Sequence, residues 1–537
     1  MWGIIIVRRR IPIDEPKNID KQRNKRVIRV RERPKKAYPI YPHRQLKELE
    51  FSTEKQKAQR SKRLYEDPEF PPEAAIQFHP LAEWRRPHRI VERPVFFSTN
   101  VSRHDIQQTG LGDCFFLAPL SLIADRPDLI EQVVPRNQSF GSDYAGIFNF
   151  NFWQHGTWIN ILVDDRLPVN VFTKKLKFTR ARNYNVFWIP LIEKAFAKLY
   201  GGYANIHGGH SAYAMQNLTG GISVFNLWKS RTPEKLKKAY EKLLLEHKLG
   251  VLLCAKSGSK KIFEDSKGNV VTIHQMGLMP NHAYAVTDVR KIDTTNGMKR
   301  LVRIRNPWGR IEWNGDWSSS SSLWKTVKDS KLRRELLDKE VNGEYWMDFW
   351  DFVRFFKNID RCYLGPEIMI QSENGRPTTK SSGCSFDSVH ANGSWSSYFN
   401  TNGGGFPKGI QRGNFHRNPQ YIVSFSSDQK SVADQKLRIL LIWQIVQKYV
   451  REHGLSEMFI SCAIYALTPE QASQSNKFPL KFFQTQTPVN KIEYSMLTSQ
   501  RKKIKPGDYV FVPFCSRQNG NGFFLLRIFA NGRLKMR

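Results

Sequence analysis

The chain has 537 residues, of which 40% are hydrophobic and 12% aromatic, so it can form packed cores and is not mainly disordered. This length predicts two to four domains. Its 84 lysines and arginines exceed its 49 acidic residues, and the resulting net charge of +35 favours acidic partners. The sequence contains no apolar run of about 18 residues, which argues against a transmembrane helix.

The cysteines are widely spaced and form no Cys-x-x-Cys pair, which argues against a zinc ribbon and against a disulfide framework. They lie at positions 114, 254, 362, 384, 462 and 515. A reducing compartment is the simplest setting for such thiols. We therefore expect a cytoplasmic protein, with the nucleus as the alternative.

The first segment, residues 1–63, is strongly basic, with twenty lysines or arginines against seven acidic residues. Because few of its apolar residues are periodic, we expect a disordered arm. Two interpretations remain open for it: a solvated tail without a partner, or a segment for nuclear import or nucleic-acid binding.

Beyond the proline-rich stretch at 64–72, helical and strand patterns alternate up to about residue 365, which indicates an α+β region. Residues 158–163 predict a strand, and residues 188–199 predict a helix with Leu191, Ala195 and Leu199 on one face. After Gly365, short strand-like runs at 420–425, 459–467, 508–513 and 522–529 are separated by Gly, Asn and Pro. This pattern predicts an antiparallel β-sandwich of about 170 residues.

The stretch QTGLGDCFFLAPLSL, from Gln108 to Leu122, places one thiol between a glycine-containing loop and an apolar run. A helix that starts near Phe115 would put Cys114 at its N-terminus, where free N–H groups and the helix dipole stabilise a thiolate. The expected result is a lowered thiol pKa and a nucleophile. The amide of Gln108, together with the backbone N–H of Cys114, could stabilise an oxyanion.

A cysteine nucleophile needs a base, and His282 opens a strand-like segment, NHAYAVT. A second strand, at 300–305, ends at Asn306, just before Pro307. If these two strands pair, Asn306 can accept a hydrogen bond from His282 and fix its ring. A Cys-His-Asn triad is therefore the hypothesis, although His282 or Asn306 alone would be read as an ordinary residue.

With these residues the sequence resembles the calpain family of papain-like cysteine endopeptidases. The resemblance covers roughly 64–537 and is carried by QTGLGDC at 108–114, FWQHGTW at 152–158, VDDRLP at 163–168, LIEKAFAKLYGGY at 191–203, TGGI at 219–222, NHAYAVTDV at 281–289, RIRNPWG at 303–309, GEYWMDFWDF at 343–352 and PGDYVFVP at 506–513. It implies an α+β, two-lobed, papain-like protease core followed by a calpain-type β-sandwich. The implied boundaries are a basic arm at 1–63, a nucleophile lobe at 64–206, a His/Asn lobe at 207–365 and the sandwich at 366–537.

The resemblance also implies the role of each site residue. Cys114 would be the nucleophile, His282 the base, Asn306 its orienting partner and Gln108 the oxyanion donor, while Trp308 would shield the His–Asn contact from water. The active site would lie between the lobes, so that their closure assembles it.

Calcium at two sites without EF-hands drives this closure in the family, and the chain matches those sites only in part. The matching ligands are Gly110 and Asp113 at the first site and Glu312 and Glu344 at the second. Carboxylates expected near Val186, Ser319 and Asn342 are missing. We therefore expect weakened calcium binding or closure without calcium, with an Arg103–Glu344 ion pair as a candidate to hold the closed form.

Two further departures concern the nucleophile helix. Phe115 replaces a tryptophan of the family, and Pro119 lies five residues into the proposed helix. A proline in a helix interior removes an N–H donor and costs about 3 kcal/mol in a regular helix. Pro119 is therefore the main sequence argument against full activity.

The leading hypothesis is an intracellular cysteine endopeptidase, a hydrolase that makes limited cuts in proteins. The alternative is a catalytically impaired scaffold that binds partners through the arm and the sandwich. Anionic phospholipid or nucleic acid are the other partners that the basic regions favour. Since the sequence contains no EF-hand loop, a small-subunit partner is not expected.

Overall fold

The computed structural model describes residues 50–76, 82–97, 101–227, 232–259, 262–264, 268, 270–310, 313–337, 343–374, 386–396, 405, 414–426, 438–450, 457–474, 476–493, 495, 497–516 and 520–537. All of them belong to one structural unit, Leu46–Arg537. Most of the basic arm, residues 1–49, lies outside the described residues, as does the candidate calcium ligand Glu312.

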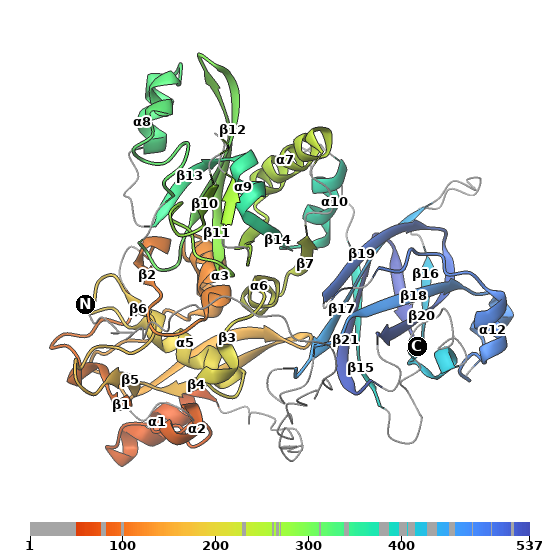
Figure 1. The fold of residues 1–537 in the computed structure, drawn as a ribbon. Helices are drawn as coiled ribbons and strands as arrows, with labels where there is room; N and C mark the ends of the chain where they lie inside the picture. The colour runs from red at the N-terminus through yellow and green to blue at the C-terminus, as the bar shows by residue number, and fades with distance from the viewer. Residues whose placement is uncertain are drawn as a thin grey trace, which may run out of the picture. The chain divides into compact units, whose positions relative to one another are not determined.

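The nucleophile lobe combines helices with three two-stranded antiparallel sheets, β1–β5, β2–β6 and β3–β4 (Figure 1). Its helices are α2 (Pro72–Ala75), α3 (Cys114–Ala124), α4 (Pro127–Val133) and α5 (Trp188–Leu199). The helices α1 (Phe51–Ser61) and α6 (Ser211–Thr219) lie outside the implied bounds 64–206, but both pack against β3 of this lobe. Its strands are β1 (Ala82–Arg85), β2 (Ile106–Gln107), β3 (Ile147–Gln154), β4 (Thr157–Asp164), β5 (Leu167–Asn170) and β6 (Arg180–Ala181).

The second lobe is built on a six-stranded sheet in the order β13-β12-β11-β8-β14-β7, accompanied by a small β9–β10 hairpin. Its strands are β7 (Ile222–Leu227), β8 (Leu252–Ser257), β9 (Ile262–Glu264), β10 (Val270–Thr272), β11 (Ala283–Thr294), β12 (Gly297–Arg305), β13 (Glu344–Asp348) and β14 (Phe356–Tyr363). Its helices are α7 (Pro233–Lys248), α8 (Ser330–Leu337), α9 (Phe349–Phe355) and α10 (Pro366–Asn374). Since α3 packs against β11 and β8, the nucleophile helix lies on one face of this sheet.

The C-terminal region is an antiparallel sandwich, as the sequence predicts, with four-stranded sheets β15-β21-β17-β19 and β18-β20-β16-β22. Its strands are β15 (Asp387–Trp395), β16 (Tyr421–Ser426), β17 (Ile439–Lys448), β18 (Ile460–Ala466), β19 (Leu497–Ile504), β20 (Gly507–Cys515), β21 (Gly522–Ala530) and β22 (Arg533–Met536), with the short helices α11 (Pro469–Ala472) and α12 (Leu480–Thr485). Apolar residues of both sheets, such as Trp443, Ile464 and Leu526, share one core. This is how a sandwich buries the inward-facing residue of each strand pair.

The expectation of disorder up to residue 63 is wrong for its last part, because residues 51–61 form α1. Ala58 and Phe51 pack with Tyr65 and Ile147, and Lys55 bonds Asp143 at 2.5 Å. Helices of marginal intrinsic stability form when tertiary contacts cover one face. Because this segment is rich in charged residues, its sequence does not indicate that one face of the helix is covered.

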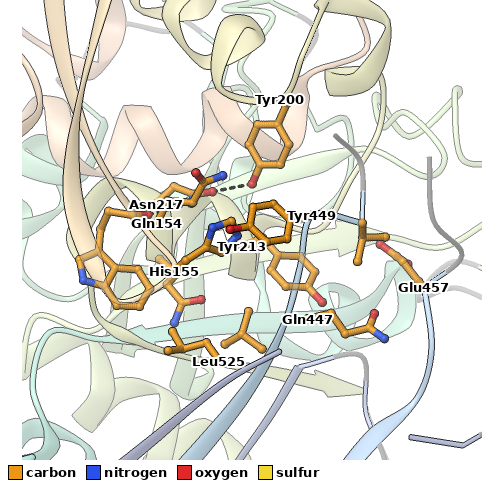
Figure 2. A pocket seen from close by; sticks show the side chains of 13 residues that line it. Gln154, His155, Tyr200, Tyr213, Asn217, Gln447, Tyr449, Glu457 and Leu525 are labelled. Atoms are coloured by element: carbon orange, nitrogen blue, oxygen red, sulfur yellow. Dashed lines mark hydrogen bonds between the residues drawn. The ribbon is translucent and has the colours of Figure 1, made fainter. Parts of the chain in front are cut away.

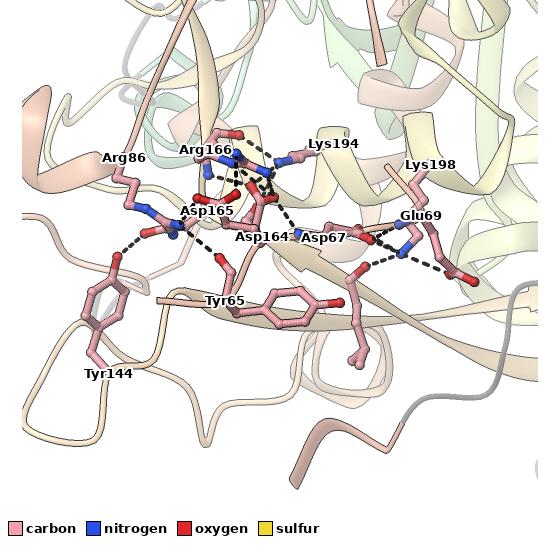
Figure 3. Close-up of polar contacts among 12 residues, drawn as sticks. Tyr65, Asp67, Glu69, Arg86, Tyr144, Asp164, Asp165, Arg166, Lys194 and Lys198 are labelled. Atoms are coloured by element: carbon pink, nitrogen blue, oxygen red, sulfur yellow. Dashed lines mark hydrogen bonds and ion pairs between the residues drawn. The ribbon is translucent and has the colours of Figure 1, made fainter. Parts of the chain in front are cut away.

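The predicted helix at 188–199 is confirmed as α5, but every one of its residues is buried, including three charged ones. Figure 3 shows how two of these charges are compensated: Lys194 bonds Asp164 at 2.6 Å, and Lys198 bonds Asp67 at 2.8 Å. Burial would raise the pKa of Asp164, but Lys194 and Arg166 outweigh it and hold that pKa below its usual range. This network fixes the segment around Asp67 onto α5.

Candidate active site

Cys114 is the first residue of α3, and its side chain is only partly exposed. Gly110 and Gly112 precede it in a loop that fits closely against its neighbours: a Cβ on Gly110 would lie 2.3 Å from the carbonyl oxygen of Lys177, and one on Gly112 would lie 2.7 Å from the ring of His207. At Gly110 the contact is with backbone, so only glycine fits there, whereas at Gly112 the exposed His207 side chain would have to move. The loop therefore needs Gly110 in order to present the thiol at the helix N-terminus.

The helix continues through Pro119 to Ala124, so the proline does not interrupt it. The chain loses the N–H donor of residue 119, but Pro119 itself is buried within the lobe. Cys114 lies N-terminal to the affected turn, and its position does not depend on the missing hydrogen bond. The helix therefore accommodates Pro119 locally.

The expected pairing of strands at the second half of the site is present. β11 and β12 are antiparallel neighbours, with Ala285 opposite Arg305. His282 directly precedes β11, Asn306 directly follows β12, and the Nε2 atom of His282 lies 3.0 Å from Oδ1 of Asn306. Since an amide oxygen can only accept, Nε2–H must donate, which leaves Nδ1 free to take a proton.

Trp308 packs on this contact, in the place that the resemblance implies for it. Its ring packs edge-on against the His282 ring with centroids 5.3 Å apart, and its backbone N–H donates to Oδ1 of Asn306 at 3.1 Å. Asn306 is completely buried. Its backbone N–H donates to the Gly343 carbonyl at 2.7 Å, and this bond holds Asn306 in place. The imidazole is thus held in one tautomer and one orientation.

The two halves meet at the nucleophile. The backbone N–H of Ala283, the residue after His282, donates to Sγ of Cys114 at 3.4 Å. The backbone N–H of Gln108 donates to the carbonyl of Pro307 at 2.8 Å. Residues from distant parts of the chain are therefore brought together in one site.

The predicted decrease of the thiol pKa is not what the structure gives. Burial raises the pKa of Cys114 to about 11, and the nearby carboxyl of Asp113 raises it further, although the N–H of Ala283, the charge of Lys256 and the N–H of Phe115 act in the opposite direction. Burial also lowers the pKa of His282 to about 4, although its bond to Asn306 raises it. Desolvation outweighs the helix N-terminus, so the resting pair is a neutral thiol and a neutral imidazole.

Gln108 is buried next to the thiol, but its amide group is already engaged. Nε2 donates to the Leu111 carbonyl at 2.7 Å and to Oδ1 of Asp113 at 3.0 Å, while Oε1 has no hydrogen-bond partner among the described residues. Both amide hydrogens are thereby used. Donation to an oxyanion would require the side chain to rotate.

The sequence did not reveal the carboxyl pair beneath the nucleophile, Asp113 and Glu193. Both are buried, and Glu193, on α5, accepts from the backbone N–H of Thr179 at 3.1 Å. Burial raises the pKa of both carboxyls, that of Asp113 to about 7, so that one proton can be shared between them. The one acidic residue inside the apolar pattern of α5, Glu193, was the available signal.

Two candidate calcium ligands among the described residues, Asp113 and Glu344, are engaged by other groups. Asp113 is fully buried and directed at Gln108 and Glu193, and the carboxylate of Glu344 lies among Arg103, His104 and Arg303. The Glu344 carboxylate is surrounded by these nitrogen groups and by the Thr287 hydroxyl, which donates to it, and cationic neighbours do not accompany a hard cation. The residues in their present contacts therefore do not fit a calcium ion.

The Arg103–Glu344 ion pair that the sequence suggested is present, with Nε and Oε2 3.5 Å apart. A second link runs from the end of β12 to the nucleophile helix: Arg305 donates to Oγ of Ser121 at 2.8 Å and to the Ile106 carbonyl at 2.7 Å. These contacts join the segment that carries Asn306 to the segment that carries Cys114.

A separate cavity of about 50 Å³ lies away from the triad, between side chains of the core and of the sandwich. Figure 2 shows its lining, which includes Tyr200, Tyr213 and His155 of the core and Gln447 and Tyr449 of the sandwich, with the ring of His155 packed against that of Tyr449. It contains no member of the triad. We assign it no part in the chemistry.

The comparisons with known proteins agree with this geometry. Residues 65–363 match the family model of the calpain family cysteine protease, and residues 391–529 match that of the calpain large subunit, domain III. The chain is 34% identical over 506 residues to calpain clp-4 of Caenorhabditis elegans, covering 91% of this chain and 68% of that protein. It is 32% identical over 487 residues to calpain-A of Drosophila melanogaster, covering 88% and 56%, and 31% identical over 485 residues to the calpain-2 catalytic subunit of Homo sapiens, covering 87% and 66%. The chain thus spans between 56% and 68% of the length of these relatives.

Proposed function

Because the chain belongs to the calpain family of cysteine proteases, we propose that it is a catalytically competent endopeptidase that makes limited cuts in intracellular proteins. The observation that carries this proposal is the joined site: Cys114 at a helix N-terminus, contacted by the N–H next to a His282 whose ring is fixed by Asn306. A Cys-His-Asn arrangement of this kind supports nucleophilic acyl transfer.

In the proposed reaction, Sγ of Cys114 attacks the scissile carbonyl while Nδ1 of His282 accepts the thiol proton. The imidazolium then protonates the leaving amine, the C–N bond breaks and a thioester remains. Water attacks this thioester, losing a proton to His282, and that proton returns to the thiolate when the acid leaves. Since the resting thiol is neutral, proton transfer accompanies attack.

The oxyanion that forms on the carbonyl needs donors from this chain. The N–H of Cys114 is one, and Gln108 becomes the second once its amide rotates away from Leu111 and Asp113. Removal of one such donor lowers kcat by about 10²- to 10³-fold in serine proteases. Substrate binding must therefore offset the loss of two hydrogen bonds within the loop.

Labelling with a thiol-reactive peptide electrophile, paired with hydrolysis of a protein substrate, tests the proposal. We expect labelling at Cys114 that His282→Ala abolishes, together with hydrolysis that is lost in both Cys114→Ala and His282→Ala. His247→Ala is the matched control, because His247 lies on α7 and contacts Asp288 rather than the site.

A scaffold without turnover is the second candidate function, and the engaged amide of Gln108 favours it. It predicts that Cys114 reacts slowly, that His282→Ala leaves this rate unchanged, and that no substrate is cut. Such a result would overturn the enzymatic proposal.

We further propose that the two lobes close without a requirement for calcium. This is supported by the contacts that already occupy Glu344, and by the link from Arg305 to Ser121. Hydrolysis should therefore persist in excess chelator. Activity that appears only on addition of calcium would contradict this proposal.

Anionic partners of the sandwich are also a proposal. The edge strand β19 exposes Arg501, Lys502 and Lys503 in sequence, which favours a phosphate-bearing surface. Binding to phosphatidylserine vesicles that decreases with salt, and that is lost when these three residues become glutamine, would support a lipid surface. Salt-dependent binding of nucleic acid that is lost on deletion of residues 1–49, which leaves α1 intact, would instead assign that partner to the basic arm.

A further inference from the structure

One face of β8 is directed at the nucleophile helix. Leu252 and Cys254 belong to the same core cluster as the residues of α3, whereas Leu253 and Ala255 belong to the cluster on the other side of the sheet. Successive side chains of a strand point to opposite faces. Lys256, two residues after Cys254, therefore lies on the face of α3.

The register of the sheet places Lys256 close to the thiol. It is directly opposite Ala283 on β11, and the N–H of Ala283 is the group that donates to Sγ of Cys114. Cα atoms of directly opposed residues are about 4.5 to 5.5 Å apart in antiparallel sheets. Cys114 accordingly experiences the positive charge of Lys256.

Lys256 is half-buried, and its ammonium makes no hydrogen bond or ion pair with any residue that the structure describes. The carboxyl that also experiences its charge is Asp360, on β14. Asp360 is already held by Nδ2 of Asn358 at 2.7 Å and by the N–H of Ala212 at 3.2 Å. A positive charge is thus presented beside the nucleophile without a paired anion in the described structure.

We propose that Lys256 is a specificity-determining residue that selects peptide substrates with an acidic side chain beside the scissile bond. The inference rests on the proposed endopeptidase function and adds its substrate class. Opposite charges about 4 Å apart attract by about 1 kcal/mol in water and by more where a bound peptide excludes water. At about 1.36 kcal/mol per factor of ten, the corresponding preference for a glutamate over a glutamine peptide is at least about fivefold in kcat/KM.

The test uses peptide sets that differ only by Glu, Gln or Lys at each position flanking the scissile bond. The wild-type protein should prefer Glu at one position, Lys256→Gln should remove this preference, and Lys256→Glu should reverse it towards Lys. The matched control is Lys299→Glu: Lys299 is also half-buried and on the same sheet, but lies opposite Ile292 near the far end of β11. It should keep the wild-type preference.

Two readouts separate this inference from the proposed function. Hydrolysis reports turnover, whereas labelling of Cys114 by electrophiles with the same three side chains reports recognition. Equal rates for all three peptides, or a Glu preference that survives in Lys256→Glu, would overturn the role of Lys256 while hydrolysis stands. Charge-selective labelling without hydrolysis would support Lys256 and overturn the proposed function, and the absence of both labelling and hydrolysis would overturn both.

Discussion

The thiol of Cys114 and the imidazole of His282 are both uncharged at neutral pH in this arrangement. A helix N-terminus stabilises a thiolate by about 0.3–2 kcal/mol. Burial acts against it and is the larger effect, so the pKa of Cys114 rises to about 11 and that of His282 falls to about 4. Burial therefore prevents the Cys114 thiol from ionising before it attacks. It also keeps the His282 imidazole neutral, so that the imidazole can accept the thiol proton.

This pair of values predicts how the reactivity of Cys114 depends on pH. The thiolate is the reactive form, and its fraction increases tenfold per pH unit below the pKa. Alkylation by iodoacetamide, followed by mass spectrometry of the Cys114 peptide, should accelerate about tenfold per unit from pH 7 to about pH 10. A rate that is constant above pH 6 would contradict reaction through a thiolate fraction set by a pKa of about 11.

The same values set the acid limit of catalysis. His282 must be neutral to accept the thiol proton, and its lowered pKa keeps it neutral until the pH falls to about 4. kcat/KM should therefore be maintained between pH 7 and pH 5 and decrease as the pH falls through about 4. A decrease centred near pH 6.5, the ordinary histidine value, would show that burial does not control this group.

At the scale of single elements, α3 carries a test of the proline that the sequence marked as a liability. Cys114 lies at the start of the helix, and the helix continues past Pro119. Pro119→Ala restores one N–H donor without moving the N-terminus, so kcat/KM should stay within about threefold of wild type. The measurement is steady-state hydrolysis alongside the thermal midpoint.

The control moves the proline by one residue, as Ala118→Pro in the Pro119→Ala background. A proline at position 118 removes the N–H that follows Cys114 by four residues, so its ring would press on the Cys114 carbonyl. Activity should fall sharply in this variant. Equal activities of Pro119→Ala and of the variant with Ala118→Pro added would mean that a proline against the first turn of α3 does not affect the nucleophile.

The elements that position the triad could be predicted because local patterns determine them. The alternation in β11 and β12, with Pro307 as a stop signal, was sufficient to place His282 beside Asn306. The engaged amide of Gln108 could not be predicted, since it depends on Asp113 and on the carbonyl of Leu111 in three dimensions. The α1 helix was missed for a similar reason, because its stability comes from contacts with Tyr65 and Ile147 rather than from its own sequence.

At the scale of the whole molecule, polar contacts join the protease core to the sandwich. Arg527, on β21, donates to the carbonyls of Gly220 and Gly221 at 2.9 and 3.0 Å and to Oε1 of Gln444 at 3.1 Å, and its guanidinium lies 4.4 Å from the Trp153 ring centre. None of the described helices is long and apolar enough to cross a bilayer. The polar contacts of Arg527 link β21 of the sandwich to the segment between α6 and β7 of the core.

The last prediction concerns this junction. Arg527→Met keeps much of the side-chain volume but leaves the two glycine carbonyls without their charged donor. Hydrogen bonds to charged groups contribute about 1.5–3 kcal/mol each, and a loss of about 3 kcal/mol is expected after partial rehydration. In calorimetry, the unfolding transition should move to lower temperature and broaden or split, because the core and the sandwich lose part of their coupling. Below the first transition hydrolysis should persist, since Arg527 contacts no triad residue.

Arg501→Met, on an exposed position of β19, is the matched control and should leave the midpoint unchanged. An Arg527→Met profile that coincides with the wild-type profile would mean that these hydrogen bonds add nothing to the coupling of the two regions.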